Sequence, residues 1–295
     1  MHPLPLVADM KFSYYVGCRE RILSRDYDRL IGFLHEHGYT AIEPLESELA
    51  PCHMFASPAE AAELRTRLDR EGIAVCCYSV CTDVYTTPAA SRAFLLLQAE
   101  IAAALGSPYL HHTIYPPFAP TPDMPSYNDA LEAVLPTLCE VIRYAASLGV
   151  TVIYEPQGLV FNGSGLTDLI ARLRACRGCE GVGVCFDFGN PAFVDCHPQD
   201  MLDDLMPLIR HVHVKDYKLL DSSSSDAPYH TASLRPMTEV AVGEGDMHAA
   251  QMLARINDYG YGGYYSIETT PSAPMTDFDA AGIEAVKFIK ESIKA

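Results

Sequence analysis

One local pattern recurs along the whole sequence: a short run rich in β-branched and aromatic residues, followed by an amphipathic segment. Eight such runs are expected to form strands, at 9–16, 40–46, 74–80, 108–114, 151–156, 183–188, 211–216 and 264–269. Eight strand–helix units in 295 residues predict a (β/α)8 TIM barrel, an α/β fold in which one domain spans residues 1–295. An open doubly wound sheet is the alternative, but no GxGxxG motif follows a strand to support nucleotide binding.

Helices are expected between these strands. Four segments carry a capping residue or a first-turn acid at their start, at Asp26, Ser57, Asp168 and Asp246. Glycines that favour a left-handed C-cap follow several of the predicted helices, at positions 38, 72, 106, 149 and 260. Longer helices fit 89–105 and 127–148, and a last one fits 279–293. The Ser- and Pro-rich segment 218–246 is expected to be a long loop and a candidate lid.

The charge and composition of the chain limit the kinds of partner that we expect it to bind. The chain has 21 basic and 38 acidic residues, and a net charge of −17 repels nucleic acid and acidic membranes, so neither partner is expected. No basic N-terminal region precedes an apolar stretch, which predicts a soluble, cytoplasmic protein. The ten cysteines are scattered, as in a reducing compartment, and the CxxC of Cys176 and Cys179 lacks a second pair at zinc-site spacing.

Four potential metal ligands each end one of the last four predicted strands: Glu155, Asp187, His213 and Glu268. The carboxyl ends of parallel barrel strands meet at one face, so these side chains are expected to converge. Two carboxylates about 4 Å apart repel by roughly 4 kcal/mol at an effective dielectric near 20, which a divalent cation would offset. One His and three carboxylates suit Mn²⁺ or Mg²⁺ and accept Co²⁺ or Zn²⁺.

The motifs around these ligands resemble the xylose isomerase-like superfamily, which includes sugar isomerases, ketose 3-epimerases and inosose dehydratases. They are YEP at Glu155, CFDFGN at Asp187, HVHVKD at 211–216, VGEGD at 242–246 and GYGGYYSIE ending at Glu268. The resemblance implies that the four ligands bind one divalent ion, with Mn²⁺ the first choice. It also implies that Glu155 and Glu268 are the catalytic acid and base. They would move a carbon-bound proton of a sugar, keto-sugar or polyol derivative through a cis-enediolate.

Two positions depart from the epimerase pattern. Phe161 stands where those enzymes have an acidic residue, and Asn190 stands where they have a histidine. These differences leave the identity of the substrate undetermined by the sequence. The alternative function is that of a lyase of the same fold, either an inosose-type dehydratase or an enzyme that eliminates a substituent from keto-glycosides. A sugar-binding barrel without catalysis is a third class. The apurinic-site endonucleases of the superfamily need the histidine that Asn190 replaces and a basic surface, which this chain lacks.

Further residues are candidates for substrate binding: His111, His112, Asn190, Lys215 and Glu43. Strand alternation lets only one of His111 and His112 face the barrel, whereas Lys215 shares the inward face of His213. Glu43 ends the second strand and could bind sugar hydroxyls or form a structural ion pair. Barrels of this superfamily often pair, which leaves room for a homo-oligomer, but no residue locates an interface.

Overall fold

The computed structural model describes residues 10–15, 17–224, 226–268 and 277–292. Its centre is one parallel sheet of ten short strands: β1 (Lys11–Tyr14), β2 (Ala41–Ile42), β3 (Leu45–Ser47), β4 (Ala74–Val75), β5 (Tyr78–Cys81), β6 (Tyr109–His112), β7 (Thr151–Tyr154), β8 (Gly183–Asp187), β9 (Ile209–Val214) and β13 (Tyr264–Ile267). Three predicted elements extend past the described residues, at 9, 16, 269 and 293.

The sheet closes into a barrel. Its order is β3-β5-β6-β7-β8-β9-β13-β1-β2-β4. β2 and β3 are two halves of one strand, as are β4 and β5, and β2 pairs with β4 while β3 pairs with β5. Ten segments less two interruptions give eight strand positions, and the predicted TIM barrel is confirmed. Pro44 lies at the first interruption, where a residue without an N–H cannot donate to a neighbouring strand.

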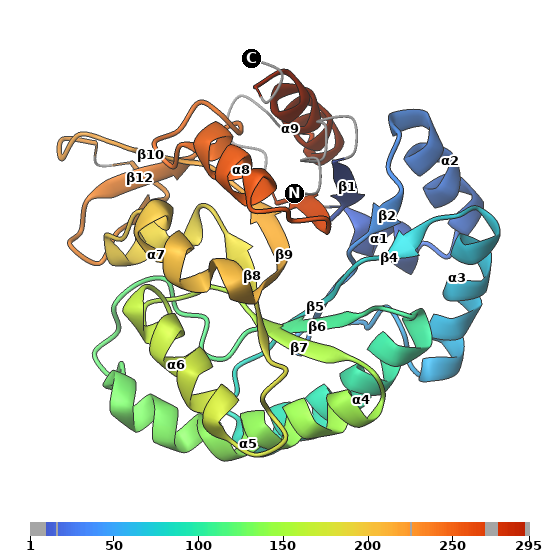
Figure 1. Cartoon of the computed structure of the whole chain (residues 1–295), viewed down its shortest axis with the longest axis horizontal. Coiled ribbons are helices and arrows are strands. Elements are labelled where there is room, and N and C mark those ends of the chain that lie inside the picture. The colour runs from blue at the N-terminus through green and yellow to red at the C-terminus, as the bar shows by residue number, and fades with distance from the viewer. Residues whose placement is uncertain (1–9, 16, 225, 269–276, 293–295) are drawn as a thin grey trace.

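Helices surround the strands (Figure 1). They are α1 (Cys18–Leu23), α2 (Tyr27–His37), α3 (Pro58–Arg70), α4 (Pro88–Leu105), α5 (Tyr127–Ser147), α6 (Ser164–Ala175), α7 (Pro198–Leu205), α8 (Ala249–Asp258) and α9 (Phe278–Ser292), with 3-10 turns at Asn190–Val194 and Met206–Leu208. Asp26 and Ser57 cap α2 and α3 as predicted, because their side chains accept the N–H groups of Arg29 and Glu60. Along the described residues, no helix is long and apolar enough to cross a membrane.

Two predicted helix starts are wrong. α6 begins at Ser164, before the predicted start at Asp168, whose carboxylate instead accepts a hydrogen bond from the Tyr127 hydroxyl at 2.8 Å. α8 begins at Ala249, and the Asp246 carboxylate accepts the backbone N–H of Leu219 at 2.8 Å. In both cases the carboxylate that is expected to cap a helix accepts a hydrogen bond from a residue distant in the sequence instead.

The segment 218–246 is not the irregular loop that its composition predicts. It forms most of a three-stranded antiparallel sheet with β10 (Tyr217–Leu219), β12 (Pro236–Glu239) and β11 (Tyr229–His230) in that order. Aromatic packing supports this sheet, since the ring of Tyr217 lies 5.5 Å from that of Phe193 and 5.7 Å from that of Tyr229. Asp216, immediately before β10, accepts the backbone N–H groups of three later residues, Gly243, Gly245 and Met247.

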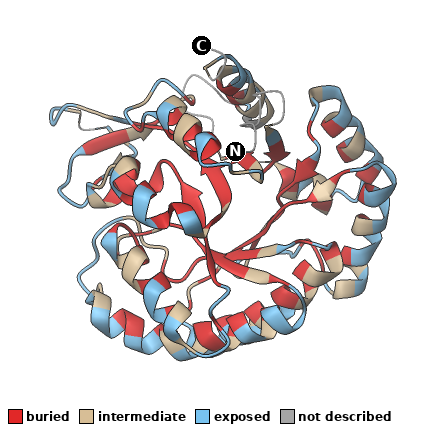
Figure 2. Ribbon diagram, in the orientation of Figure 1, coloured by how far each residue is buried: buried red, intermediate tan, exposed pale blue. Residues whose placement is uncertain are grey.

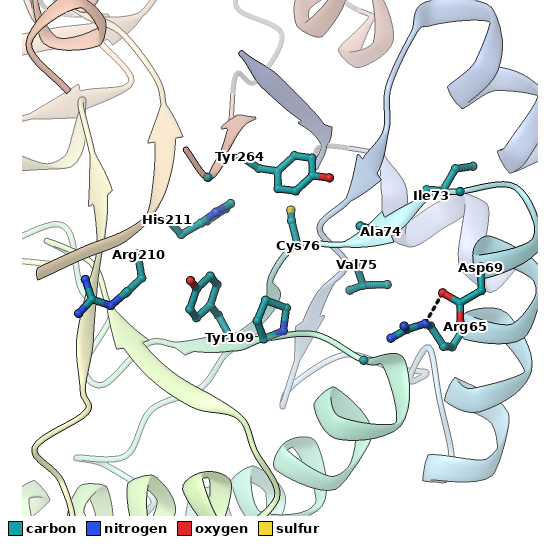
Figure 3. A pocket seen from close by; sticks show the side chains of 14 residues that line it. Arg65, Asp69, Ile73, Ala74, Val75, Cys76, Tyr109, Arg210, His211 and Tyr264 are labelled. Carbon is teal, nitrogen blue, oxygen red and sulfur yellow. Dashed lines mark hydrogen bonds and ion pairs between the residues drawn. The ribbon is translucent and has the colours of Figure 1, made fainter. Parts of the chain in front are cut away.

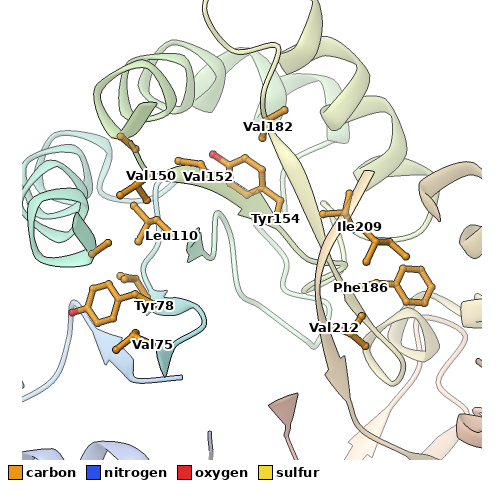
Figure 4. Packing of buried hydrophobic residues seen from close by; sticks show 14 of the residues in the cluster. Val75, Tyr78, Leu110, Val150, Val152, Tyr154, Val182, Phe186, Ile209 and Val212 are labelled. Atoms are coloured by element: carbon orange, nitrogen blue, oxygen red, sulfur yellow. The ribbon is translucent and has the colours of Figure 1, made fainter. Parts of the chain in front are cut away.

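The main apolar core lies between the strands and the helices (Figure 4). Val152 and Tyr154 point outward into it, whereas Ile153 points into the barrel, as strand alternation predicts. The barrel interior holds a much smaller apolar cluster, formed by Ala41, Cys76, Cys77, Ile153 and Cys185. Figure 2 shows the strands almost wholly buried and the outer faces of the helices exposed. All ten cysteines are free.

Candidate metal centre

The structure brings the four predicted ligands together at the carboxyl end of the barrel. One ligand atom from each of Glu155, Asp187, His213 and Glu268 lies within 4.8 Å of all the others. The residues lie at or just after the ends of β7, β8, β9 and β13, which follow one another around the sheet. In the strand register Asp187 is opposite His213. The convergence is therefore a direct result of parallel pairing.

The ligand atoms form a compact arrangement around the His213 imidazole. His213 Nδ1 lies 3.1 Å from Glu155 Oε2 and 3.0 Å from Glu268 Oε2. Asp187 Oδ1 accepts the backbone N–H groups of Gly189 and Asn190 at 2.8 and 2.5 Å, which fixes its carboxylate. Two buried oxygens of the cluster, Asp187 Oδ2 and Glu268 Oε2, have no hydrogen-bond partner among the described residues.

The two glutamates are in different electrostatic environments. Burial raises the pKa of Glu155 to about 7, and the hydrogen bond with His213 only partly opposes this. Burial also acts on Glu268, but the Lys215 ammonium and the His213 imidazole outweigh it and lower the pKa of Glu268 to about 2. Of two carboxyl groups facing one point, Glu268 is thus ionised at neutral pH while Glu155 is about half protonated.

Lys215 and Asn190 lie beside the cluster. Lys215 Nζ donates to Glu268 Oε1 at 2.7 Å and to Asn190 Oδ1 at 3.4 Å, and it lies 3.9 Å from Asp187 Oδ2. Lys215 therefore points inward as strand alternation predicts, and its shortest ion pair is with Glu268. Burial opposes its charge, but the Glu268 and Asp187 carboxylates raise the pKa of Lys215 well above its ordinary value.

The adjacent histidines of β6 face opposite ways. His111 points into the barrel, with Nε2 3.4 Å from Glu155 Oε1 and Nδ1 3.0 Å from Ser79 Oγ. Burial lowers the pKa of His111 to about 3. His112 points toward the helices, where its Nε2 lies 3.0 Å from the hydroxyl of Tyr154. Of the two candidate substrate contacts, the structure places His111 at the site and His112 away from it.

Glu43 lies inside the barrel below the ligand cluster, with no exposed surface. Glu43 Oε1 is 2.9 Å from His213 Nε2, and Glu43 Oε2 is 2.7 Å from His211 Nε2. Burial raises the pKa of Glu43, but the His211 and His213 imidazoles outweigh it and hold that pKa well below its usual range. The structural ion pair is thus the arrangement present, rather than a position at the barrel mouth.

Other residues near the site have weaker sequence signals. Ser79 and Ser266 contact Glu43 from inward positions of their strands. The only sequence signal for either residue is a small polar side chain between apolar neighbours. The ring of Tyr15 stacks on the imidazole of His213 with centroids 5.1 Å apart. Phe161 is buried and packs against Tyr127 with ring centroids 5.9 Å apart, so the position that is acidic in epimerases belongs here to the core.

Pockets open at both ends of the barrel. Tyr15 and Glu268 line a pocket of about 940 Å³ at the carboxyl end, where the candidate ligands converge. A second pocket, of about 590 Å³, lies at the amino end and is lined by residues that include Arg65, Tyr109 and Arg210 (Figure 3). Only the first pocket reaches one of the four candidate ligands, so it is the candidate entrance for a substrate.

The chain belongs to the xylose isomerase-like TIM barrel family, whose sequence profile matches residues 31–292. No curated protein matches the chain.

Solved structures of the same fold cover nearly all of this chain. A D-psicose 3-epimerase with D-tagatose from Clostridium cellulolyticum H10 has a TM-score of 0.70 and 14% identity, covering 96% of this chain and 99% of that one. A xylose isomerase-like TIM barrel protein from Mycobacterium smegmatis in complex with magnesium has a TM-score of 0.67, 18% identity and 98% coverage of both chains. A probable 3-DHS dehydratase from Bacillus anthracis has a TM-score of 0.63 and 15% identity, covering 97% and 98%. At these identities the likeness establishes the fold alone.

Proposed function

We propose that this protein is a divalent-metal-dependent sugar isomerase or epimerase that moves a carbon-bound proton through a cis-enediolate. One observation carries the proposal: the ligand atoms of Glu155, Asp187, His213 and Glu268 lie within 4.8 Å of one another at the carboxyl end of the barrel. Active sites of this fold lie at that end. The substrate would be a sugar, keto-sugar or polyol derivative.

The residues present fit a divalent ion. Asp187 Oδ2 and Glu268 Oε2 are buried without a hydrogen-bond partner in the described structure, although buried polar atoms are normally paired. Three carboxylates and one imidazole make an oxygen-rich ligand set, which suits Mn²⁺ or Mg²⁺ and also accepts Co²⁺ or Zn²⁺. When bound, such an ion would act as a Lewis acid that stabilises the negative charge of the enediolate.

Glu155 and Glu268 would transfer the proton. A base must start ionised, and the pKa of about 2 suits Glu268 for that role. An acid must start protonated near neutral pH, and the pKa of about 7 suits Glu155. His111 Nε2, buried without a hydrogen-bond partner beside Glu155, is available to accept a sugar hydroxyl. Asn190 and Lys215 would orient the opposite side of the substrate.

Proton exchange with solvent tests this function. Purified protein loaded with Mn²⁺ is incubated in D₂O with a panel of ketoses, and deuterium at the carbon next to the carbonyl is followed by NMR. We expect exchange by the wild type and none by Glu268→Gln, which lacks the proposed base. Glu140→Gln, a substitution of a half-buried glutamate on α5 that pairs with Arg92, is the control and should exchange normally. Exchange retained by Glu268→Gln would refute the role of that residue as the base.

A lyase of the same fold is the second candidate. The observation that favours it is Lys215 Nζ, an ammonium 2.7 Å from Glu268 Oε1 and 3.4 Å from Asn190 Oδ1, whose charge could stabilise a departing oxygen. Elimination from an inosose or a keto-glycoside would form a conjugated enone that absorbs in the ultraviolet. Ultraviolet absorbance that rises with these substrates, without exchange in the ketoses, would favour the lyase.

A further inference from the structure

Glu43 occupies a special place beneath the ligand cluster. It follows β2, which is three strand positions from β9 around the sheet, and its side chain reaches both histidines of β9 through the interior. Interiors of barrels of this fold are normally filled by branched aliphatic side chains. A carboxylate with no exposed surface at this position therefore requires a specific explanation.

Four hydrogen-bond donors saturate the Glu43 carboxylate. Oε1 receives Ser79 Oγ at 2.5 Å and His213 Nε2 at 2.9 Å. Oε2 receives Ser266 Oγ and, at 2.7 Å, His211 Nε2. Two carboxylate oxygens offer about four acceptor sites in total. No acceptor site is left for a sugar hydroxyl, so Glu43 is not placed to bind substrate.

The direction of these hydrogen bonds follows from Glu43 being the acceptor. His213 must donate through Nε2, which leaves Nδ1, the nitrogen 3.1 Å from Glu155 Oε2, facing the candidate ion site. Ser79 must donate to Glu43, so its oxygen is free to accept the proton of His111 Nδ1. The remaining nitrogen of His111, Nε2, then presents a lone pair on the side of Glu155.

We propose that Glu43 is a positioning residue that sets the orientation and tautomer of two histidines, His213 directly and His111 through Ser79. It holds one nitrogen of each ring available at the site while touching neither ion nor substrate. This inference rests on the proposed function, because it assumes that His213 binds the ion. Partners of this kind behind metal-binding histidines typically contribute 10–100-fold to metal affinity.

Mn²⁺ affinity measured by isothermal titration calorimetry tests the proposal. Glu43→Gln keeps the side-chain size but turns one acceptor oxygen into an NH₂ donor, which cannot receive an imidazole N–H. We expect its Mn²⁺ affinity to fall about 10–100-fold. The control is Glu46→Gln, which changes an equally buried glutamate on β3 whose oxygens accept the backbone N–H groups of Ser47 and Met54. Its Mn²⁺ affinity should match that of the wild type.

A second readout reports the histidines without depending on Mn²⁺. Long-range ¹H–¹⁵N NMR of histidine-labelled wild type should show a proton on Nε2 of His213 and on Nδ1 of His111, with Nε2 of His111 unprotonated. In Glu43→Gln at least one of these patterns should change. If Glu43→Gln does not fold, Glu43→Asp keeps the charge on a shorter side chain, and we expect it to weaken Mn²⁺ binding by a smaller factor.

Each outcome bears on the proposal. Equal Mn²⁺ affinity in Glu43→Gln and wild type would overturn it while leaving the proposed function intact. Glu43, His111 and His213 also meet the spacing of a metal-holding group, so Glu43 itself could be a ligand. Two Mn²⁺ ions per wild-type chain, with one lost in Glu43→Gln, would establish that rival role and refute ours. A wild type that binds no divalent ion would refute the proposed function and, with it, the role of Glu43 behind an ion.

Discussion

Lys215 Nζ lies 2.7 Å from Glu268 Oε1, whereas no described lysine or arginine forms an ion pair with Glu155. The two glutamates face the same cluster, yet only one has an ammonium partner. This difference contributes to a pKa of about 2 for Glu268 and about 7 for Glu155. The geometry thus gives the two glutamates different pKa values, as the proposed base and acid require.

Removing that ammonium should impair the base. We expect Lys215→Met to raise the pKa of Glu268, because the ionised form loses its nearest cation. The acidic limb of the pH profile for solvent deuterium exchange should then move upward by about 1–3 pH units, the range over which an adjacent cation shifts a carboxyl group. Lys218→Met, which removes an exposed lysine on β10, is the control. An acidic limb that does not move would show that Lys215 does not lower the pKa of Glu268.

Stabilisation by Mn²⁺ should increase with pH. The pKa values of Glu155 and His213 are both raised in the folded protein, so the stability they contribute is present at low pH and is lost as pH rises through those values. For Glu155 that loss falls between its ordinary pKa and pH 7, and it reaches up to about 3 kcal/mol at roughly 1.4 kcal/mol per unit. A divalent ion offsets the carboxylate repulsion that then develops.

Melting temperatures with Mn²⁺ and with EDTA, measured from pH 6 to pH 9, check this expectation. The melting temperature with Mn²⁺ minus that with EDTA should increase with pH in the wild type. In Glu155→Gln this difference should increase less. A difference that is constant or falls with pH would contradict the electrostatic account of the cluster.

Substitution of the two adjacent histidines should separate function from stability. His111→Asn should raise the KM for the sugar about tenfold, the loss of one hydrogen bond of ~1.4 kcal/mol, whereas His112→Asn should leave that KM unchanged. His112→Asn should instead lower the free energy of unfolding by about 1–3 kcal/mol, because the buried Tyr154 hydroxyl loses its partner. Urea denaturation and steady-state kinetics of both variants provide the comparison. The reverse pattern would mean that the two side chains face the other way.

Asp216 should anchor the three-stranded sheet after β9. Asp216→Ala leaves three backbone N–H groups without their acceptor, at a cost of about 1–3 kcal/mol for each that stays unsatisfied. We expect faster hydrogen–deuterium exchange across 217–247 and unchanged exchange in α4 and α5. Asp221→Ala, at an exposed position of the same segment, should exchange as the wild type does. Unchanged exchange in Asp216→Ala would show that the sheet is held by its aromatic packing alone.

The sequence was sufficient to predict the barrel and the convergence of its four candidate ligands. Strand alternation determines that Glu155 and Ile153 share the inward face, and parallel pairing of consecutive strands brings their carboxyl ends together. The contact between Glu43 and His213 could not be predicted in this way. The two residues are 170 positions apart and meet across the barrel, so their contact depends on its diameter and on the length of both side chains.

Short-range signals failed where a distant partner competed. An acid before an amphipathic segment is typical of a helix start, but the Asp246 carboxylate binds the N–H of Leu219 instead. The strand Tyr229–His230 has two residues, too few for alternation to show. It pairs with β12, and its Tyr229 packs against the ring of Phe193, a contact between residues 36 positions apart in the chain.

The main apolar core of this protein lies outside its barrel, while the barrel interior carries serines, histidines, glutamate and cysteines. The contacts that keep the chain folded are thus largely separate from the groups that would do chemistry. A substitution of an inward-facing side chain would therefore remove less apolar packing than a substitution of an outward-facing one. Such a division of labour would let related barrels acquire new substrates while their architecture stays the same.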